Sequence, residues 1–207
     1  MHIPILEFLF SFGLLLIAMT VHEFAHGFTA YKLGDNTAKY SGRLTLNPLA
    51  HIDLFWTLLL PLLLFISSGG NLVFGAAKPV PVSYWALKNP KRDMVLIGLS
   101  GPLANFILAA ILATVLRIVP LPGLMNLMAV NLLVINVLLG VFNLIPIPPL
   151  DGSRILLGLL PDPLAAQFIA IERYSFFLII LLIWTGVINS IVWPAVGFIL
   201  RLLGVSS

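Results

Sequence analysis

Five mainly apolar stretches follow one another along the chain, separated by segments rich in polar residues, Gly and Pro. A helix that crosses a lipid bilayer needs about 20 apolar residues, and four of the stretches are long enough. The remaining stretch, residues 54–66, is shorter and contains Pro61. The pattern therefore predicts four candidates for membrane-spanning helices, at about residues 3–31, 94–116, 121–147 and 174–200.

The first and last of these stretches need further interpretation. Gly186, Asn189 and Pro194 interrupt the last one, which is either one tilted helix or a span followed by a half-span. No basic segment precedes the first stretch, and no small-residue cleavage site follows it. Secretory signal peptides have both features, so we interpret residues 3–31 as a retained helix.

Two connections between the apolar stretches, residues 34–52 and 69–93, are rich in Gly, Pro and Asn. Each contains a short run of alternating side chains, at residues 43–46 and 78–82, which is typical of a strand. Prolines limit the second run to the edge of a sheet. The whole pattern predicts an all-α polytopic membrane protein with about four to six transmembrane segments and short strand-like or re-entrant connections.

The composition excludes two broad classes of protein. Hydrophobic residues make up 60% of the 207 residues and charged residues only 9%, whereas soluble domains are about half apolar and about a quarter charged. Disordered chains are polar and rich in charge. The net charge of +3 comes from basic residues scattered between the apolar stretches, so we expect them to orient the chain in a bilayer and expect no nucleic-acid partner. The chain contains no Cys, which excludes disulfides and cysteine metal sites.

The first apolar stretch contains the motif H-E-x-x-H at residues 22–26. Residues four apart lie on one face of a helix, so the imidazoles of His22 and His26 can reach one metal ion. In zinc hydrolases this arrangement leaves a metal-bound water beside a carboxylate, here Glu23, that can accept its proton. The alternative is that the motif lies at a helix end among lipid headgroups and is only solvated, because Lys32 follows closely.

A zinc site with two histidines needs a third protein ligand, and Asp151 is the strongest candidate. It follows three prolines at residues 146–149, at the end of a long uncharged stretch. Prolines cannot continue a helix, and unwound chain at membrane depth is tolerated only against protein or a wet cavity. The alternative is a loop aspartate that, with Gly152, caps a helix beginning near Ser153. The other candidate ligands are His2, His51 and the remaining acidic residues.

Other polar residues and glycines have simpler interpretations. His51 and Asp53 form either a second metal site or, as we favour, the polar boundary of residues 54–66. Gly98 and Gly101 lie three apart and permit close contact with another helix. Amides inside membrane helices mostly form hydrogen bonds between helices. We therefore expect packing roles for both glycines and for Asn126, Asn131 and Asn136.

The paired motifs resemble those of the site-2 protease family of intramembrane zinc metalloproteases. That family combines H-E-x-x-H in one core helix with an N-x-x-P-x-x-x-x-D-G segment in another. The chain has Asn143, Pro146, Asp151 and Gly152 at the matching positions. The spacing of eight residues between the Asn and the Asp is that of the family pattern.

Three further segments add to the resemblance, which spans residues 20–155. The sequence SGPLAN, which ends at Asn105, resembles the G-P-x-x-N of the intervening core helix and gives Asn105 a stronger functional case than the other amides. Residues 43–48 and 77–82 resemble connections of the compact prokaryotic branch. The chain departs from the family after Asp53, where the family pattern has a Pro and a Gly.

The resemblance implies one zinc ion (Zn2+) per chain, with His22, His26 and Asp151 as ligands. It implies Glu23 as the general base, and Asn143 as a residue that steadies the oxyanion or the scissile backbone. The implied activity is that of an intramembrane zinc endopeptidase, which hydrolyses peptide bonds in or near transmembrane segments of membrane proteins, as in regulated intramembrane proteolysis. Two alternatives stay open, namely a catalytically silent relative that binds membrane partners and a metal transporter.

Further expectations concern organisation and location. We expect residues 1–207 to form a single integral membrane domain without an appended PDZ or CBS domain. The expected location is a prokaryotic cell membrane, with the active site toward the cytoplasmic side. The expected partners are the lipid bilayer and a transmembrane protein substrate, and the oligomeric state is open.

Zinc ligation also constrains the topology. The end of the first helix and the exit of residues 121–147 must lie on the same side, so residues 54–66 are predicted to be re-entrant. An unwound substrate is expected to bind as an added strand, at residues 43–46 or 72–74. By the positive-inside rule, one cytoplasmic face then carries Lys32, Lys39, Arg43, Lys78, Lys88, Lys91 and Arg92.

Overall fold

The computed structural model describes residues 5–67 and 77–205, and the regular structure within them is entirely helical. This confirms the predicted all-α fold. The helical elements are α1 (Ile5–Lys32), α2 (Thr37–Tyr40), η1 (Pro48–His51), η2 (Leu54–Leu59), α3 (Leu60–Ser67), η3 (Tyr84–Ala86), α4 (Pro90–Ile118), α5 (Gly123–Asn143), α6 (Asp151–Leu159), α7 (Asp162–Glu172), α8 (Ser175–Trp184) and α9 (Val187–Leu202).

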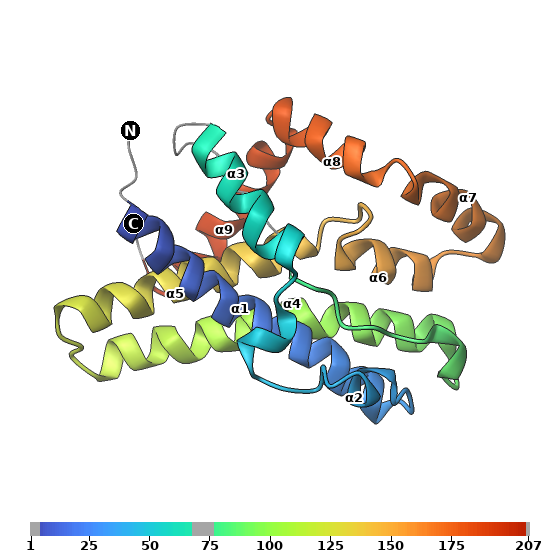
Figure 1. Ribbon diagram of the computed structural model, residues 1–207, viewed down its shortest axis with the longest axis horizontal. Helices are drawn as coiled ribbons and strands as arrows, with labels where there is room; N and C mark the ends of the chain where they lie inside the picture. Colours follow the sequence, from blue (N-terminus) through green and yellow to red (C-terminus); the bar gives the residue numbers. More distant parts are fainter. Residues whose placement is uncertain (1–4, 68–76, 206–207) are drawn as a thin grey trace.

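The helices α1, α4 and α5 lie alongside one another and form the centre of the molecule (Figure 1). Each is long and apolar enough to cross a membrane, which confirms three of the predicted spans. Ile97, near the start of α4, packs with Ala30, near the end of α1. Farther along α4, the Asn105 amide donates to the Ala18 carbonyl of α1 at 3.2 Å. The two helices are therefore antiparallel, and α5 returns beside them in the direction of α1.

The helix α9 packs on the centre of the bundle and completes its apolar core. Val192 and Val196 of α9 are buried in one cluster with Leu133 and Val137 of α5. Ala109 of α4 belongs to the same cluster. The small side chain at that position lets α4 approach α5. The cluster therefore buries valine and leucine side chains of α5 and α9 beside small side chains of α4.

The fourth predicted span is divided into two helices. Residues 174–200 form α8 and α9, which are 10 and 16 residues long. Gly186 between them has a φ of +75°, a left-handed conformation that glycine adopts without steric cost. Of the two readings of this stretch, the single tilted helix is thus wrong. Among the described residues, three helices meet the length and hydropathy of a membrane span.

Residues 54–66 fold as η2 and α3, and the described residues on either side of this part of the chain lie close together. The Lys78 amide donates to the His51 carbonyl at 2.9 Å, which joins the two flanks of the segment. At the far end, Phe65 of α3 lies 4.6 Å from Phe8 of α1 between ring centroids. Since α1 ends and α4 begins at the same end of the bundle, residues 33–89 make no net crossing. This agrees with the predicted re-entrant segment, whose place in a membrane stays a prediction.

The predicted strands at residues 43–46 and 78–82 were wrong, because the described residues contain none. In the first segment the polar groups bond locally: the Thr45 carbonyl accepts from His51 Nε2 at 2.9 Å. In the second, Pro79 and Pro81 have no N–H to donate, and the N–H of Val80 bonds a carboxylate. The predicted substrate edge at residues 72–74 lies outside the described residues.

Candidate active site

The structure brings His22, His26 and Asp151 together, although 125 residues separate the last two in sequence. The Nε2 atoms of the two histidines are 3.1 Å apart. Asp151 Oδ2 lies 2.9 Å from His22 Nε2, and Asp151 Oδ1 lies 3.2 Å from His26 Nε2. Both histidines are buried, with 5% and 8% of their surface exposed. The predicted ligand set is therefore one spatial cluster.

Hydrogen bonds at the other ring nitrogens fix the tautomers of the two histidines. His22 Nδ1 faces the Asn105 side-chain oxygen at 2.5 Å, and His26 Nδ1 faces the Ile97 carbonyl at 2.7 Å. Both partners are acceptors, so each neutral ring carries its proton on Nδ1. Each Nε2 then presents a lone pair to the carboxylate of Asp151, whose Oδ2 is buried without a hydrogen-bond donor. Several lone pairs that converge in a buried site call for a cation between them.

The donor set fits zinc. Zinc bonds of about 2.0–2.1 Å at tetrahedral angles place neighbouring donor atoms roughly 3.3 Å apart. The separations of 2.9–3.2 Å between the two Nε2 atoms and the carboxylate oxygens are close to that value. Two imidazoles and one carboxylate, each able to give one donor atom, form a common ligand set of catalytic zinc sites.

The antiparallel packing of α1 and α4 depends on Gly101. A Cβ atom at this position would lie 2.6 Å from His26 Cε1 and 2.7 Å from His22 Cε1, which is closer than atoms approach. Gly101 therefore forms the wall against which both imidazoles rest. The sequence predicted only close helix contact here, and the contact is with the side chains of the two ligand candidates themselves. Gly98 instead faces α6, where a Cβ atom would lie 3.2 Å from the Asp151 carbonyl.

A loop of seven residues connects the end of α5 to the start of α6, and this loop brings Asp151 to the histidines. The prolines at residues 146–149 prevent helix there, which confirms the predicted unwinding. Gly152 lets this loop fold back, since a Cβ atom there would overlap the Leu144 carbonyl. The loop thereby places the Asp151 carboxylate against the Nε2 atoms of both histidines.

Glu23 lies beside the cluster but outside it. Its Oε2 accepts a hydrogen bond of 2.8 Å from the Val80 N–H. Pro79 and Pro81 flank Val80, and a residue before proline is restricted to extended conformations. The two prolines leave Val80 as the sole backbone donor of residues 79–81 and restrict its conformation. The sequence indicated an edge strand here and missed this contact; the alternation of proline with one donor residue was the available signal.

The other predicted site residues fall outside the cluster. Asn143 is the last residue of α5, and its amide donates to the Leu139 carbonyl at 3.0 Å in the same helix. Its catalytic role stays a prediction. Asp53 caps η2 by accepting from the amides of Phe55 and Trp56, and His51 Nε2 bonds the Thr45 carbonyl. Both residues thus serve the boundary of residues 54–66, as favoured from the sequence.

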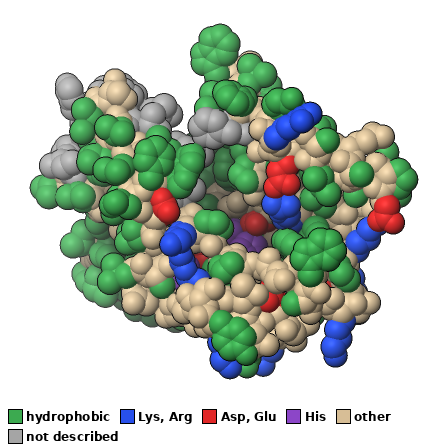
Figure 2. All heavy atoms as spheres, turned by 45° about the vertical axis from the view of Figure 1, so that its right-hand side comes forward, with side chains coloured by type: hydrophobic (Ala, Val, Ile, Leu, Met, Phe, Trp, Pro, Cys, Tyr) green, Lys and Arg blue, Asp and Glu red, His purple; other side chains and the backbone are tan. Residues whose placement is uncertain are grey.

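A hollow in the molecular surface exposes polar side chains. Figure 2 shows histidine and acidic side chains on its floor, with hydrophobic and charged side chains around its mouth. Arg154, one helical turn after Asp151, forms an ion pair of 2.6 Å with Glu172 at the end of α7. A largely buried group of two histidines and one carboxylate is the kind of site at which a bound metal ion can activate water for hydrolysis.

Comparison with known proteins identifies the family. The model of peptidase family M50 matches residues 9–126 and 122–183. "Putative zinc metalloprotease YwhC" of Bacillus subtilis (strain 168) is 38% identical over 189 residues, which cover 87% of this chain and 82% of that protein. "Putative zinc metalloprotease Rip2" of Mycobacterium tuberculosis (strain ATCC 25618 / H37Rv) is 31% identical over 193 residues, 92% of this chain and 73% of that protein.

A more distant relative is "Zinc metalloprotease MJ0392" of Methanocaldococcus jannaschii, which is 31% identical over 151 residues, 72% of this chain and 34% of that protein. No solved structure matches the chain. The family match extends over both helices that carry the metal-ligand candidates and over the loop between α5 and α6. The chain therefore belongs to peptidase family M50 and is an integral membrane zinc metalloprotease of the site-2 type.

Proposed function

We propose that this metalloprotease hydrolyses peptide bonds inside the membrane, in the transmembrane segments of other membrane proteins, as in regulated intramembrane proteolysis. The observation that carries the proposal is the position of the cluster along a helix that is long and apolar enough to span a membrane. His22 lies ten residues before the end of α1, which corresponds to about 15 Å along the helix axis. A site so far inside a membrane-spanning helix meets a substrate at the same depth.

The proposed mechanism assigns a role to each side chain of the site. His22, His26 and Asp151 would hold the zinc ion, and a bound zinc ion would supply a charge that polarises the scissile carbonyl and makes water more acidic. Glu23 accepts a proton from the attacking water and passes it to the leaving amine. Val80 holds one carboxylate oxygen of Glu23, which leaves the other oxygen for the water. Asn143 would steady the substrate backbone after its side chain leaves the Leu139 carbonyl.

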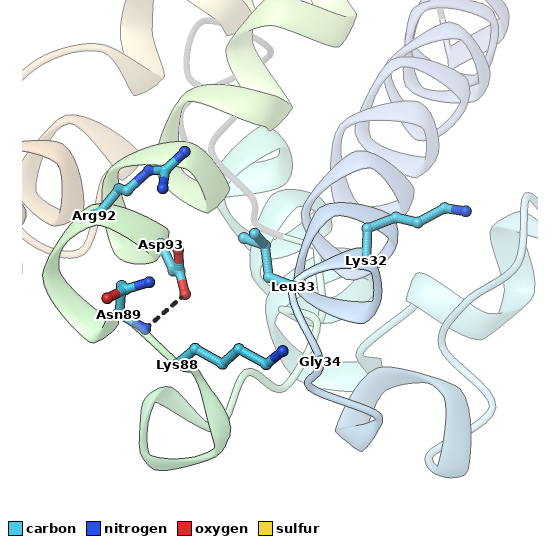
Figure 3. A pocket seen from close by; sticks show the side chains of 7 residues that line it. All are labelled: Lys32, Leu33, Gly34, Lys88, Asn89, Arg92 and Asp93. Carbon is cyan, nitrogen blue, oxygen red and sulfur yellow. Dashed lines mark hydrogen bonds between the residues drawn. The ribbon is translucent and has the colours of Figure 1, made fainter.

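The basic residues support an active site toward the cytoplasm. Lys32, Lys88 and Arg92 are exposed around a cavity of about 250 Å³ where α1 ends and α4 begins. Figure 3 shows Lys88 and Arg92 on one side of this cavity and Lys32 on the helix opposite, and Asp93 beside Arg92 accepts a hydrogen bond from the backbone N–H of Asn89. The seven cations that we predict to be cytoplasmic all lie before α4 or in its first turn. Arg117 lies in the last turn of α4, at the opposite end of that helix. We propose that the end of the bundle nearest the cluster faces the cytoplasmic side of a prokaryotic cell membrane.

A substrate helix hides its peptide bonds in hydrogen bonds between residues i and i−4, so it must unwind before cleavage. A suitable test protein is therefore a single-span protein whose transmembrane helix contains Gly and Pro. A matched protein with an all-Leu span is the control, because leucine favours the helix. We expect the purified enzyme in detergent to cleave the first protein inside its span and to leave the second intact.

The decisive variant is Glu23→Gln, with Glu7→Gln in the exposed first turn of the same helix as its control. Loss of a general base costs about 10²–10⁴ in rate, so Glu23→Gln should lose cleavage while it keeps its zinc. Glu7→Gln should cleave like the wild type. Wild-type cleavage by Glu23→Gln would contradict the mechanism, and cleavage of soluble proteins in preference to the Gly-Pro span would contradict an intramembrane substrate.

A further inference from the structure

Two asparagines behind His22 form a buried chain of hydrogen bonds that joins three helices. Asn105 of α4 and Asn136 of α5 are both 0% exposed. The Asn136 side-chain oxygen accepts from Asn105 Nδ2 at 2.7 Å, and the Asn105 side-chain oxygen in turn faces His22 Nδ1 at 2.5 Å. This series of hydrogen bonds therefore runs from α5 through α4 to a metal-ligand candidate on α1.

Backbone carbonyls fix the direction of both side-chain amides in this series of hydrogen bonds. Asn136 Nδ2 donates to the Leu132 carbonyl of its own helix at 2.8 Å, which turns the Asn136 oxygen toward Asn105. Asn105 Nδ2 donates both to that oxygen and to the Ala18 carbonyl at 3.2 Å. Rotation of the Asn105 amide would place its oxygen against two acceptors and its NH2 group against the His22 Nδ1–H. Asn136, together with the Ala18 carbonyl, thus determines which atom Asn105 presents to His22.

We propose that Asn136 is a positioning residue of the metal site, acting through Asn105 to keep the His22 proton on Nδ1 and its Nε2 lone pair on the metal. The inference rests on the proposed role of His22 as a ligand, and on nothing about the substrate. His26 needs no such relay, because the backbone carbonyl of Ile97 holds it directly. An amide at position 136 is therefore more than packing between helices, which is all the sequence indicated.

Asn131 provides a matched control on the same helix. Its Nδ2 also donates to a backbone carbonyl four residues earlier, that of Leu127, at 2.8 Å. It lies on a more exposed side of α5 and faces none of the ligand candidates. Asn131→Leu and Asn136→Leu thus remove the same local hydrogen bond, and only the second removes the acceptor for Asn105.

The experiment measures metal affinity rather than activity. Zinc dissociation constants of the purified full chain are determined by chelator competition, and the absorption spectrum of bound Co2+ reports the ligand geometry. Loss of an outer partner of a metal-ligating histidine typically weakens metal binding about 10–100-fold. We expect Asn105→Leu to fall in that range and Asn136→Leu to weaken zinc binding about tenfold with an altered Co2+ spectrum. Asn131→Leu should match the wild type.

A double-mutant cycle separates the relay from a general packing role. If Asn136 acts through Asn105, Asn136→Leu has no further effect on zinc affinity in the Asn105→Leu background. Additive losses, or wild-type affinity in a folded Asn136→Leu protein, would overturn the proposal. If the leucine variant does not fold, Asn136→Ala takes its place in the same cycle. His22→Ala is measured in parallel. If His22→Ala keeps full zinc affinity, the assignment of His22 as a ligand is wrong. If His22→Ala loses zinc but Asn136→Leu binds zinc like the wild type, only the proposed role of Asn136 is wrong.

Discussion

In α4, residues that face α1, α5 and α6 are deeply buried, among them Gly101, Pro102 and Asn105, whereas α7 buries none of its residues. The exposure continues into α8, where 71% of Phe177 and 85% of Trp184 are exposed. Both regions are rich in apolar residues, so hydrophobicity alone does not separate them. The difference lies in what their side chains contact: metal-ligand candidates and neighbouring helices in one region, the surroundings of the molecule in the other.

This contrast indicates that the two regions have different roles. A metal site works only if its ligands are held to within about half an ångström, and the packing of α4 on α1 and α6 provides that constraint. The segment from α7 to α8 lies at the periphery of the molecule (Figure 1). We therefore expect substitutions of residues that contact the ligand candidates to abolish zinc binding and cleavage, and substitutions in α7 and α8 to be tolerated.

The largest effect is expected from an added methyl group at Gly101. Gly101→Ala places a Cβ atom within 2.7 Å of both imidazoles, so the histidines must move and zinc binding should fall by more than an order of magnitude. Overpacking of this kind also costs about 1–3 kcal/mol of stability. Gly197→Ala in α9 is the control, because a Cβ atom there meets nothing within 4 Å. Equal zinc affinity of the two variants would show that the wall at Gly101 is not needed.

A smaller but specific effect is expected at Val80. Val80→Pro removes the N–H that Glu23 accepts, and a hydrogen bond to a charged group contributes about 1.5–3 kcal/mol. We expect kcat to fall about 10–100-fold while KM and zinc content stay near wild type. Val80→Ala keeps the N–H and should retain most activity. A loss in Val80→Ala as large as in Val80→Pro would assign the effect to the valine side chain instead.

The smallest effect is expected for the ion pair between α6 and α7. Arg154 and Glu172 have side chains that are 30% and 34% exposed, and pairs of this kind contribute about 0–1 kcal/mol. Arg154→Ala should therefore change the melting temperature by only a few degrees and keep its zinc. A loss of zinc in this variant would mean that α7 helps to position Asp151, and the contrast between the two regions would fail.

The sequence predicted the parts of this structure that depend on local pattern. The lengths of the apolar stretches predicted α1, α4 and α5. The prolines before Asp151 predicted the unwound loop that brings this residue to the histidines. The spacing of His22 and His26 placed both on one helix face. The position of Asp151 beside them depends on the packing of three helices. The unwound segment made Asp151 the strongest candidate, and the motif resemblance implied the same ligand.

Other features depended on partners that no local pattern reveals. The alternating residues 43–46 and 78–82 were predicted as strands, but their polar groups bond a histidine and a carboxylate instead of each other. Gly101 and Asn136 looked like ordinary packing residues, because their contacts lie on other helices. The division of residues 174–200 at Gly186 was open from the sequence, since a glycine in a membrane helix adopts either helical or left-handed geometry.

Zinc binding by His22, His26 and Asp151 is measured by elemental analysis of the purified wild type, Asp151→Ala and His22→Ala after dialysis against a weak chelator. We expect about one zinc per wild-type chain, as is usual for a site with three protein ligands, and a large loss of zinc from Asp151→Ala. Full zinc in Asp151→Ala together with its loss from His22→Ala would contradict this ligand set, and the third ligand would then be sought first at His51 or Asp53.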